Sequence, residues 1–222
     1  MAARRSIFVV SLFVLMSLLC RPALADAIVN GNFASGNLSG WTVFNTSNGT
    51  NGTGLPAVVS FNTTGGGASN SAQFEVGEVT IDDTPQGGGL SQMISVSTGG
   101  LYSFSAAIAA EGLVAINADA GTFSIIIDGS TVATDSLGTI APSQIIRATL
   151  SGSDTLTAGP HSFEIEITRV FGELDSGTPY EYVTNIASTV PSSAPEPASL
   201  ALLGFGLTTM ASLALKRRSV RR

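Results

Sequence analysis

Apolar segments with basic flanks stand at both ends of this 222-residue chain and enclose a long acidic middle. Residues 26–194 hold 15 acidic against 2 basic residues, a formal charge of −13 with His161 neutral. Nucleic acids are bound through Lys and Arg on phosphates, so this charge argues against a nucleic-acid partner. Cys20, the only cysteine, lies in the first apolar segment, which excludes disulfides, thiolate metal sites and a cysteine nucleophile from the middle.

The N-terminal segment has the parts of a secretory signal peptide. Arg4 and Arg5 precede the apolar run 7–20, and Ala23-Leu24-Ala25 places small residues at the two positions that signal peptidase reads. The 14 residues of the apolar run are too few for a comfortable membrane span. The sequence therefore predicts a signal peptide over residues 1–25, cut by signal peptidase after Ala25, and an exported chain.

The C-terminal segment, residues 198–215, contains 18 residues without a charge. As a helix it would extend about 27 Å and just cross a hydrocarbon core of about 30 Å. Lys216, Arg217 and Arg218 follow at once, and cationic residues beside a span stay on the cytoplasmic side. The pattern predicts a marginal transmembrane helix over 198–215 and a basic cytoplasmic tail over 216–222. A buried core helix is the alternative, which the basic end disfavours.

Residues 190–197 form a linker that ends in Pro195-Glu196-Pro197. Two prolines without amide hydrogens keep the backbone around Glu196 extended and unpaired, the form that a protease can grip. A plain linker is the alternative, and physically the segment is also a linker.

This order of tripeptide, apolar helix and basic tail at residues 195–222 resembles a PEP-CTERM sorting signal. In that family the tail is recognised by a membrane protease called exosortase, in Gram-negative bacteria that make exopolysaccharide. The resemblance implies that Pro195, Glu196 and Pro197 are the motif that exosortase reads. It also implies that the helix holds the substrate in the membrane transiently and that Lys216, Arg217 and Arg218 stop transfer. Thr208-Thr209 departs from the pattern and weakens the helix as a permanent anchor. The implied outcome is a chain cut near Pro195 and released or handed to the cell surface.

From Ala57 onward the apolar residues recur with period two, which is typical of strands with one buried face. The clearest case is Phe163-Glu164-Ile165-Glu166-Ile167, and Asp128-Gly129 is a hairpin signal. Three glycine clusters are expected to be turns: Gly65-Gly66-Gly67, Gly87-Gly88-Gly89 and Gly99-Gly100. Many short strands between turns predict an all-β domain, a β-sandwich or jelly roll, over residues 26–189. The Ala-rich stretch 106–120 is left open between a short helix and a loop.

Asn30-Gly31-Asn32-Phe33 and Leu38-Ser39-Gly40-Trp41 open this domain. They resemble the start of jelly-roll domains similar to carbohydrate-binding modules. Many extracellular proteins that bind no sugar share this opening, so the resemblance supports the fold more than a function.

The charged residues offer few catalytic or metal-binding sets. His161 is the only histidine, and no Gly-x-Ser-x-Gly elbow accompanies it, so a triad and a zinc site are both disfavoured. Glu164 and Glu166 point the same way on one strand, as a glycosidase pair would, but acids alternate on many solvated strands. Asp82-Asp83 and Asp119 could join backbone carbonyls around Ca²⁺, although no spaced ligand loop is visible. We therefore predict no catalytic residue, no metal site and no cofactor.

Trp41, the sole tryptophan, and Tyr102, Tyr180 and Tyr182 are the aromatic residues best suited to stack on sugar rings. Core packing is the preferred interpretation for them, and Trp41 is retained as a possible sugar-binding residue. The leading prediction is an exported, non-enzymatic surface or extracellular-matrix protein that exosortase processes. A carbohydrate-binding module that contacts exopolysaccharide is the first alternative, and a glycoside hydrolase built on Glu164 and Glu166 is the second.

Overall fold

Alternating apolar side chains place most of the domain in strands. The computed structural model describes residues 28–82, 84–113, 119–170 and 178–189. Within them the strands are β1 (Thr42–Asn45), β2 (Gly49–Thr50), β3 (Ala57–Phe61), β4 (Ser69–Phe74), β5 (Gly77–Glu78), β6 (Gln86–Val96), β7 (Gly100–Glu111), β8 (Thr122–Ile127), β9 (Ser130–Ser136), β10 (Ile145–Leu156), β11 (Gly159–Arg169) and β12 (Tyr180–Thr189).

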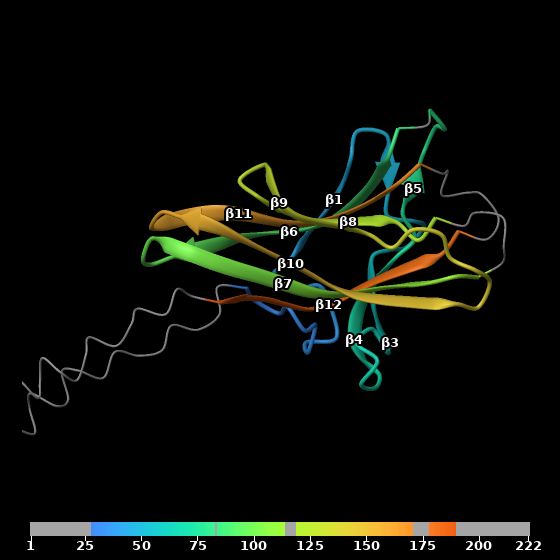
Figure 1. Ribbon diagram of the computed structural model, residues 1–222, viewed down its shortest axis with the longest axis horizontal. Helices are drawn as coiled ribbons and strands as arrows, with labels where there is room; N and C mark the ends of the chain where they lie inside the picture. The colour runs from blue at the N-terminus through green and yellow to red at the C-terminus, as the bar shows by residue number, and fades with distance from the viewer. Residues whose placement is uncertain (1–27, 83, 114–118, 171–177, 190–222) are drawn as a thin grey trace, which may run out of the picture.

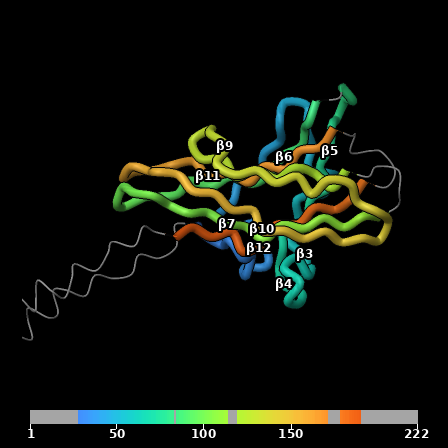
Figure 2. The backbone as a smooth tube through the Cα atoms, viewed as in Figure 1, coloured from blue at the N-terminus to red at the C-terminus, as the bar shows by residue number. Residues whose placement is uncertain are grey.

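The strands form two five-stranded antiparallel sheets that face each other (Figures 1 and 2). The first sheet has the order β1-β6-β11-β8-β9, the second has the order β10-β7-β12-β4-β3, and β2 and β5 form a small separate pair. Consecutive strands such as β6 and β7 belong to opposite sheets, as in a sandwich whose chain crosses between layers. The all-β prediction is confirmed. In the described ranges no helix is long and apolar enough to cross a membrane.

The core lies between the two sheets and follows the period-two pattern. Phe163, Ile165 and Ile167 of β11 are fully buried, and Phe104 and Ile108 of β7 face them from the second sheet. Because successive side chains of a strand point to opposite faces, Glu164 and Glu166 lie on the outer face of the first sheet. The predicted hairpin at Asp128-Gly129 joins β8 to β9.

Residues 28–41 close one side of the sandwich by bridging β6 and β12. The Gln92 side chain accepts a hydrogen bond from Val29 N (2.7 Å) and donates to Val29 O (3.0 Å) and Gly40 O (2.7 Å). Ile186 N of β12 donates to Gly31 O at 2.9 Å. The opening segment is thus structural, since it seals the core between the two sheets.

The expected turn at Gly87-Gly88-Gly89 is wrong, because these residues belong to β6. A Cβ on Gly87 or Gly89 would overlap the carbonyl oxygen of Ile167 or Ile165 on the neighbouring β11. The glycines therefore permit a close approach of two backbones rather than a reversal of the chain. Gly65-Gly66-Gly67 does lie between β3 and β4, as expected.

The Ala-rich stretch continues β7 through Glu111, with Ala109 and Ala110 fully buried, and residues 114–118 lie outside the described part. Strand β10 has no counterpart among the predicted strands. It pairs with β7 along its whole length, and at Gly152 it approaches Val132 of β9 so closely that a side chain would not fit. That contact closes the second side of the sandwich.

Candidate functional site

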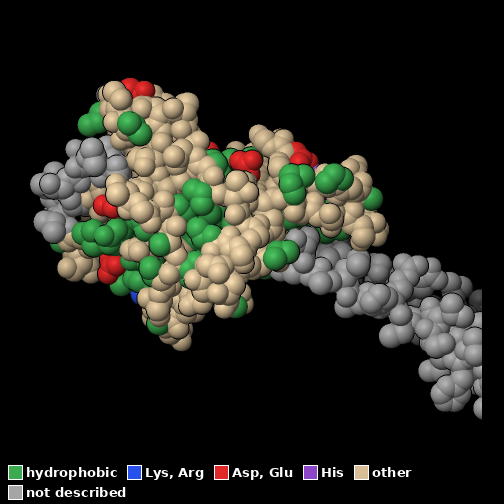
Figure 3. Space-filling view, turned by 180° about the vertical axis from the view of Figure 1, so that it is seen from behind, with side chains coloured by type: hydrophobic (Ala, Val, Ile, Leu, Met, Phe, Trp, Pro, Cys, Tyr) green, Lys and Arg blue, Asp and Glu red, His purple; other side chains and the backbone are tan. Residues whose placement is uncertain are grey.

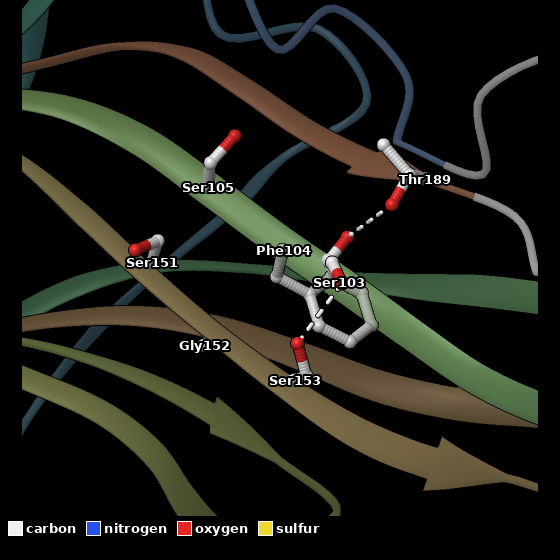
Figure 4. A pocket seen from close by; sticks show the side chains of 7 residues that line it. All are labelled: Ser103, Phe104, Ser105, Ser151, Gly152, Ser153 and Thr189. Carbon is white, nitrogen blue, oxygen red and sulfur yellow. Dashed lines mark hydrogen bonds between the residues drawn. The ribbon is translucent and has the colours of Figure 1, made fainter.

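A hydroxyl-lined groove lies on the second sheet where β7, β10 and β12 run side by side (Figure 4). Its volume is about 370 Å³, and its lining is Ser103, Phe104, Ser105, Ser151, Gly152, Ser153 and Thr189. Ser103 Oγ and Ser153 Oγ are 2.9 Å apart, and Thr189 Oγ1 donates to Ser103 O at 3.4 Å. The groove therefore offers several hydroxyl groups, each able to donate and to accept hydrogen bonds.

Strand register produces this groove. Ser151 pairs with Ser105, and Ser153 pairs with Ser103, so four hydroxyls share the outer face of β10 and β7. Thr189 of β12 pairs with Ser103 from the other side. Small side chains at neighbouring positions leave the surface low, which is why a depression forms there.

The same outer face carries an aromatic pair further along the sheet. Phe61 of β3 stacks on Tyr182 of β12 with the ring centroids 3.6 Å apart and the planes 1° apart. The Tyr182 hydroxyl donates to Glu111 at 2.9 Å and accepts from Gln73 at 3.2 Å. Burial, and then the hydrogen bond to Glu111, raises the pKa of Tyr182, so its hydroxyl stays protonated. Phe61 thus covers the ring of Tyr182, one of the tyrosines that the sequence suggested for sugar stacking.

Arg147 extends this face on β10. It pairs in register with Ala109, which in turn pairs with Tyr182, so the three positions form one row across the sheet. The Arg147 Nε donates to Asn62 O at 2.7 Å, which ties β10 to the β3–β4 loop. From Arg147 to Ser153 the face runs about 20 Å at ~3.3 Å per residue.

Trp41 lies in the core. It is 9% exposed and packs against Phe33 and Phe163 with centroid distances of 6.2 and 6.1 Å. Its indole Nε1 donates to Asn30 O at 3.1 Å. Stacking on a sugar needs an exposed ring face, and the structure leaves Trp41 little of one. Tyr102 is also buried, with its hydroxyl on Thr98 O at 2.8 Å.

His161 holds together two turns at one end of the sandwich. Its Nδ1 is 2.6 Å from Asp128 Oδ2, and its Nε2 is 2.9 Å from Thr157 O. Two acceptors suit an imidazole that carries both protons, and the hydrogen bond to Asp128 raises the pKa of His161. The same hydrogen bond lowers the pKa of Asp128. Both ring nitrogens are thus occupied by structural contacts.

Glu164 and Glu166 lie on the outer face of the first sheet, away from the hydroxyl groove. Glu164 sits between Ser91 and Ile126 in register, and Glu166 sits between Gly89 and Ser124. Burial, and then the neighbouring Glu164 charge, raises the pKa of Glu166. Neither residue lines the groove, and the arrangement is that of acids on a partly solvated strand face.

The candidate calcium residues Asp82 and Asp119 are held in different local structures. Asp119 bridges Thr139, and its Oδ1 accepts from Gly121 N at 3.0 Å. Asp82 N donates to Glu78 Oε2 at 2.7 Å. Across the described ranges, no three His, Cys, Asp or Glu side chains gather as a metal-binding group.

The structure contains a buried ion pair that the sequence did not predict. Arg169 of β11 and Glu181 of β12 are 1% and 0% exposed, with Nε and Oε1 3.8 Å apart. Arg169 donates to Val76 O at 3.0 Å and Glu181 accepts from Val76 N at 3.1 Å, so the pair pins both backbone groups of Val76. Burial raises the pKa of Glu181 to about 8, against the lowering effect of the Arg169 charge. An alternating pattern gives no signal for such a pair, because both residues occupy apolar positions.

Charged side chains are sparse and mostly acidic on the face of the domain in Figure 3.

The predicted sorting and cleavage residues lie outside the described part of the chain: Ala23, Ala25, Pro195, Glu196, Pro197, Lys216, Arg217 and Arg218. Their roles are predicted from the sequence alone.

Comparison with known proteins confirms the sorting signal. Residues 193–218 match the family model of the PEP-CTERM protein-sorting motif, a range that contains the Pro-Glu-Pro tripeptide and the first basic residues of the tail. No curated protein matches the chain.

Solved structures similar to this chain include several carbohydrate-binding modules. TmCBM61 in complex with beta-1,4-galactotriose is 12% identical with a TM-score of 0.45, over 75% of this chain and 99% of that one. The CBM22-1 xylan-binding domain of Paenibacillus barcinonensis Xyn10C is 14% identical with a TM-score of 0.42, over 76% and 96%. The CBM35 of Cellvibrio japonicus Abf62 is 14% identical with a TM-score of 0.37, over 67% and 93%.

Proposed function

We propose that this chain is an exported, non-enzymatic surface protein whose tail is processed by exosortase. The match of residues 193–218 to the PEP-CTERM sorting motif carries the proposal, because it places a sorting signal directly after a folded all-β domain. Residues 1–25 are the signal peptide in this account, and signal peptidase cuts after Ala25. Residues 26–189 are the exported domain, 190–197 the linker, 198–215 a transient membrane helix and 216–222 a cytoplasmic tail.

The end of β12 fits this order of parts. Thr189 pairs with Ser103 near the end of the sandwich where the turns after β6 and β10 lie (Figure 1). Five residues separate Thr189 from Pro195, which at ~3.5 Å per extended residue gives a reach of about 20 Å. A protease in the membrane can therefore reach the Pro-Glu-Pro motif while the domain stays folded.

A variant of the motif tests this proposal in a bacterium that makes exosortase. We expect Glu196→Ala to keep the tail and to remain in the membrane fraction, and Ser192→Ala, just before the matched range, to be processed as the wild type is. Equal processing of both variants would contradict the role of the motif.

The non-enzymatic assignment is supported by the placement of the candidate residues. Both ring nitrogens of His161 contact structural partners, and Glu164 and Glu166 lie outside the groove. Turnover of any glycoside by the purified chain, lost in Glu166→Gln, would contradict it.

Polysaccharide binding is the second candidate, and the hydroxyl-lined groove favours it. Four serines and a threonine around about 370 Å³ suit the hydroxyl groups of a sugar chain, since each can donate and accept. Exopolysaccharide is the ligand class that fits an exported protein of this kind.

Matched substitutions on the two outer faces test this second candidate. Ser153→Leu fills the groove, whereas Thr134→Leu changes the comparable hydroxyl pair between Ser124 and Thr134 on the first sheet. We expect only Ser153→Leu to reduce retention of the protein on immobilised exopolysaccharide. Equal retention of both variants and the wild type would remove the groove from consideration.

A further inference from the structure

Arg147 is the only exposed arginine or lysine side chain among the described residues. Arg169, the other base of the acidic middle, is 1% exposed and lies beside Glu181. Across the described ranges, Arg147 takes part in no ion pair, because the two pairs there are those of His161 and Arg169. An exposed guanidinium without a carboxylate partner is available to a ligand.

The Arg147 side chain is held along its stem and open at its tip. Its Nε donates to Asn62 O at 2.7 Å, and a Cβ on Gly65 would lie 3.8 Å from its Cδ, so the β3–β4 loop flanks the stem. Within the described part of the chain, no hydrogen bond occupies the two terminal nitrogens. Glu111 lies near Arg147 by register but accepts from the Tyr182 hydroxyl. A guanidinium fixed in this way presents a planar pair of donors that matches a carboxylate.

Arg147 lies in line with the hydroxyl groove along the outer face of β10. The exposed positions of this strand alternate from Arg147 through Thr149 to Ser151 and Ser153, while Leu150 points into the core. Figure 4 shows Ser151 and Ser153 at the groove. At ~3.3 Å per residue, Arg147 stands about 13 Å from Ser151. A polymer that lies along β10 can therefore contact the groove and the guanidinium together, whereas a single sugar cannot.

We propose that Arg147 makes the groove select a polysaccharide that carries carboxylate groups, a polyuronate, over a neutral one. This inference rests on the polysaccharide binding proposed above as the second candidate function. The serine hydroxyls can bond sugar hydroxyls in either kind of polymer, so they do not distinguish the two. The guanidinium does, because a charge-assisted pair of hydrogen bonds needs an anionic acceptor.

The acidity of the domain does not cancel this contact. At physiological ionic strength, charges more than about 8 Å apart are largely screened, whereas the guanidinium and a bound carboxylate meet at hydrogen-bond distance. The formal charge of −13 instead opposes non-specific adsorption of the protein to a polyanion. Retention on an acidic polymer would therefore report specific contacts.

A pair of matched polymers tests the inference. The purified full-length chain is applied at physiological ionic strength to immobilised polygalacturonate and to the same polymer after reduction of its carboxylates to alcohols. We expect the wild type to bind the acidic polymer about tenfold more tightly, the size expected for one hydrogen-bonded charge. Arg147→Gln should bind both polymers equally, at the wild-type affinity for the reduced one. Arg147→Lys should keep part of the preference, since it keeps the charge and loses the planar fork.

Two further variants separate the groove and the net charge from the arginine. Ser153→Leu should weaken binding to both polymers. The double variant Arg147→Gln, Thr134→Arg restores the net charge on the outer face of the first sheet and should not restore the preference.

The outcomes distinguish this inference from the proposed function beneath it. Equal wild-type binding to both polymers, still weakened by Ser153→Leu, would overturn the selectivity and leave the groove as the binding site. An equal loss on both polymers in Arg147→Gln would also overturn it, because the arginine would then act only by holding the loop. Absence of binding to either polymer would remove the proposed polysaccharide binding and this inference with it.

Discussion

Replacing Trp41 by Ala separates a core role from a sugar-binding role. Trp41 is 9% exposed, packs between Phe33 and Phe163 and donates its indole hydrogen to Asn30 O. A buried tryptophan covers about 150–250 Å². At about 25 cal/mol per Å², that area corresponds to about 4–6 kcal/mol.

Large-to-small core substitutions of this kind cost about 3–5 kcal/mol, which agrees with the area. For a domain of this size, about 4 kcal/mol lowers Tm by about 10 °C. Trp41→Phe keeps a ring against Phe33 and Phe163 but loses the bond to Asn30, so we expect a smaller loss of about 1–2 kcal/mol.

Far-UV circular dichroism during thermal and urea unfolding is the suitable assay, since the substitution removes the only tryptophan fluorophore. The expected order of stability is wild type, Trp41→Phe, Trp41→Ala. If Trp41→Ala unfolds as the wild type does and instead loses retention on polysaccharide, the core assignment is refuted and Trp41 is a binding residue.

Three further predictions test other contacts. The folded protein raises the pKa of His161 above its ordinary value of about 6.5, so the wild type should lose stability as pH rises from about 6.5 through the folded-state pKa. His161→Gln should remove this loss, and equal pH profiles of the two proteins would contradict the role of His161. Glu181→Gln should gain stability relative to the wild type as pH rises from about 4.5 to about 8, because over that range the unfolded wild type ionises while folded Glu181 stays protonated, and pH-dependent urea unfolding measures it. Gly89→Ala should cost about 3 kcal/mol because its Cβ meets the Ile165 carbonyl, whereas Gly66→Ala should cost under about 0.5 kcal/mol, and comparable denaturation midpoints would refute the close-approach argument.

Period-two alternation was sufficient to predict the central strands. Phe163, Ile165 and Ile167 alternate with acids, so both the strand and its buried face follow from the sequence. Strand β10 was not predicted, because Gly152 and Asp154 interrupt its apolar positions between Leu150 and Leu156. Its place depends on pairing with β7, which is a tertiary effect.

The candidate sites were harder to predict than the fold. The hydroxyl groove is assembled from three strands that lie far apart in sequence, so its serines carry no local signal. The burial of Glu78 was not predicted either, because burial of one acid depends on how β2 and β5 pack. The tail motif, in contrast, is contiguous in the sequence, and it was predicted from residues 195–222.

Intact-mass measurement of the mature protein from its native cells tests the central claim most directly. The account predicts a chain that begins at Asp26 and ends close to Pro195, and a tail that remains attached in cells without exosortase. A native protein that keeps residues 198–222 in the presence of active exosortase would contradict it.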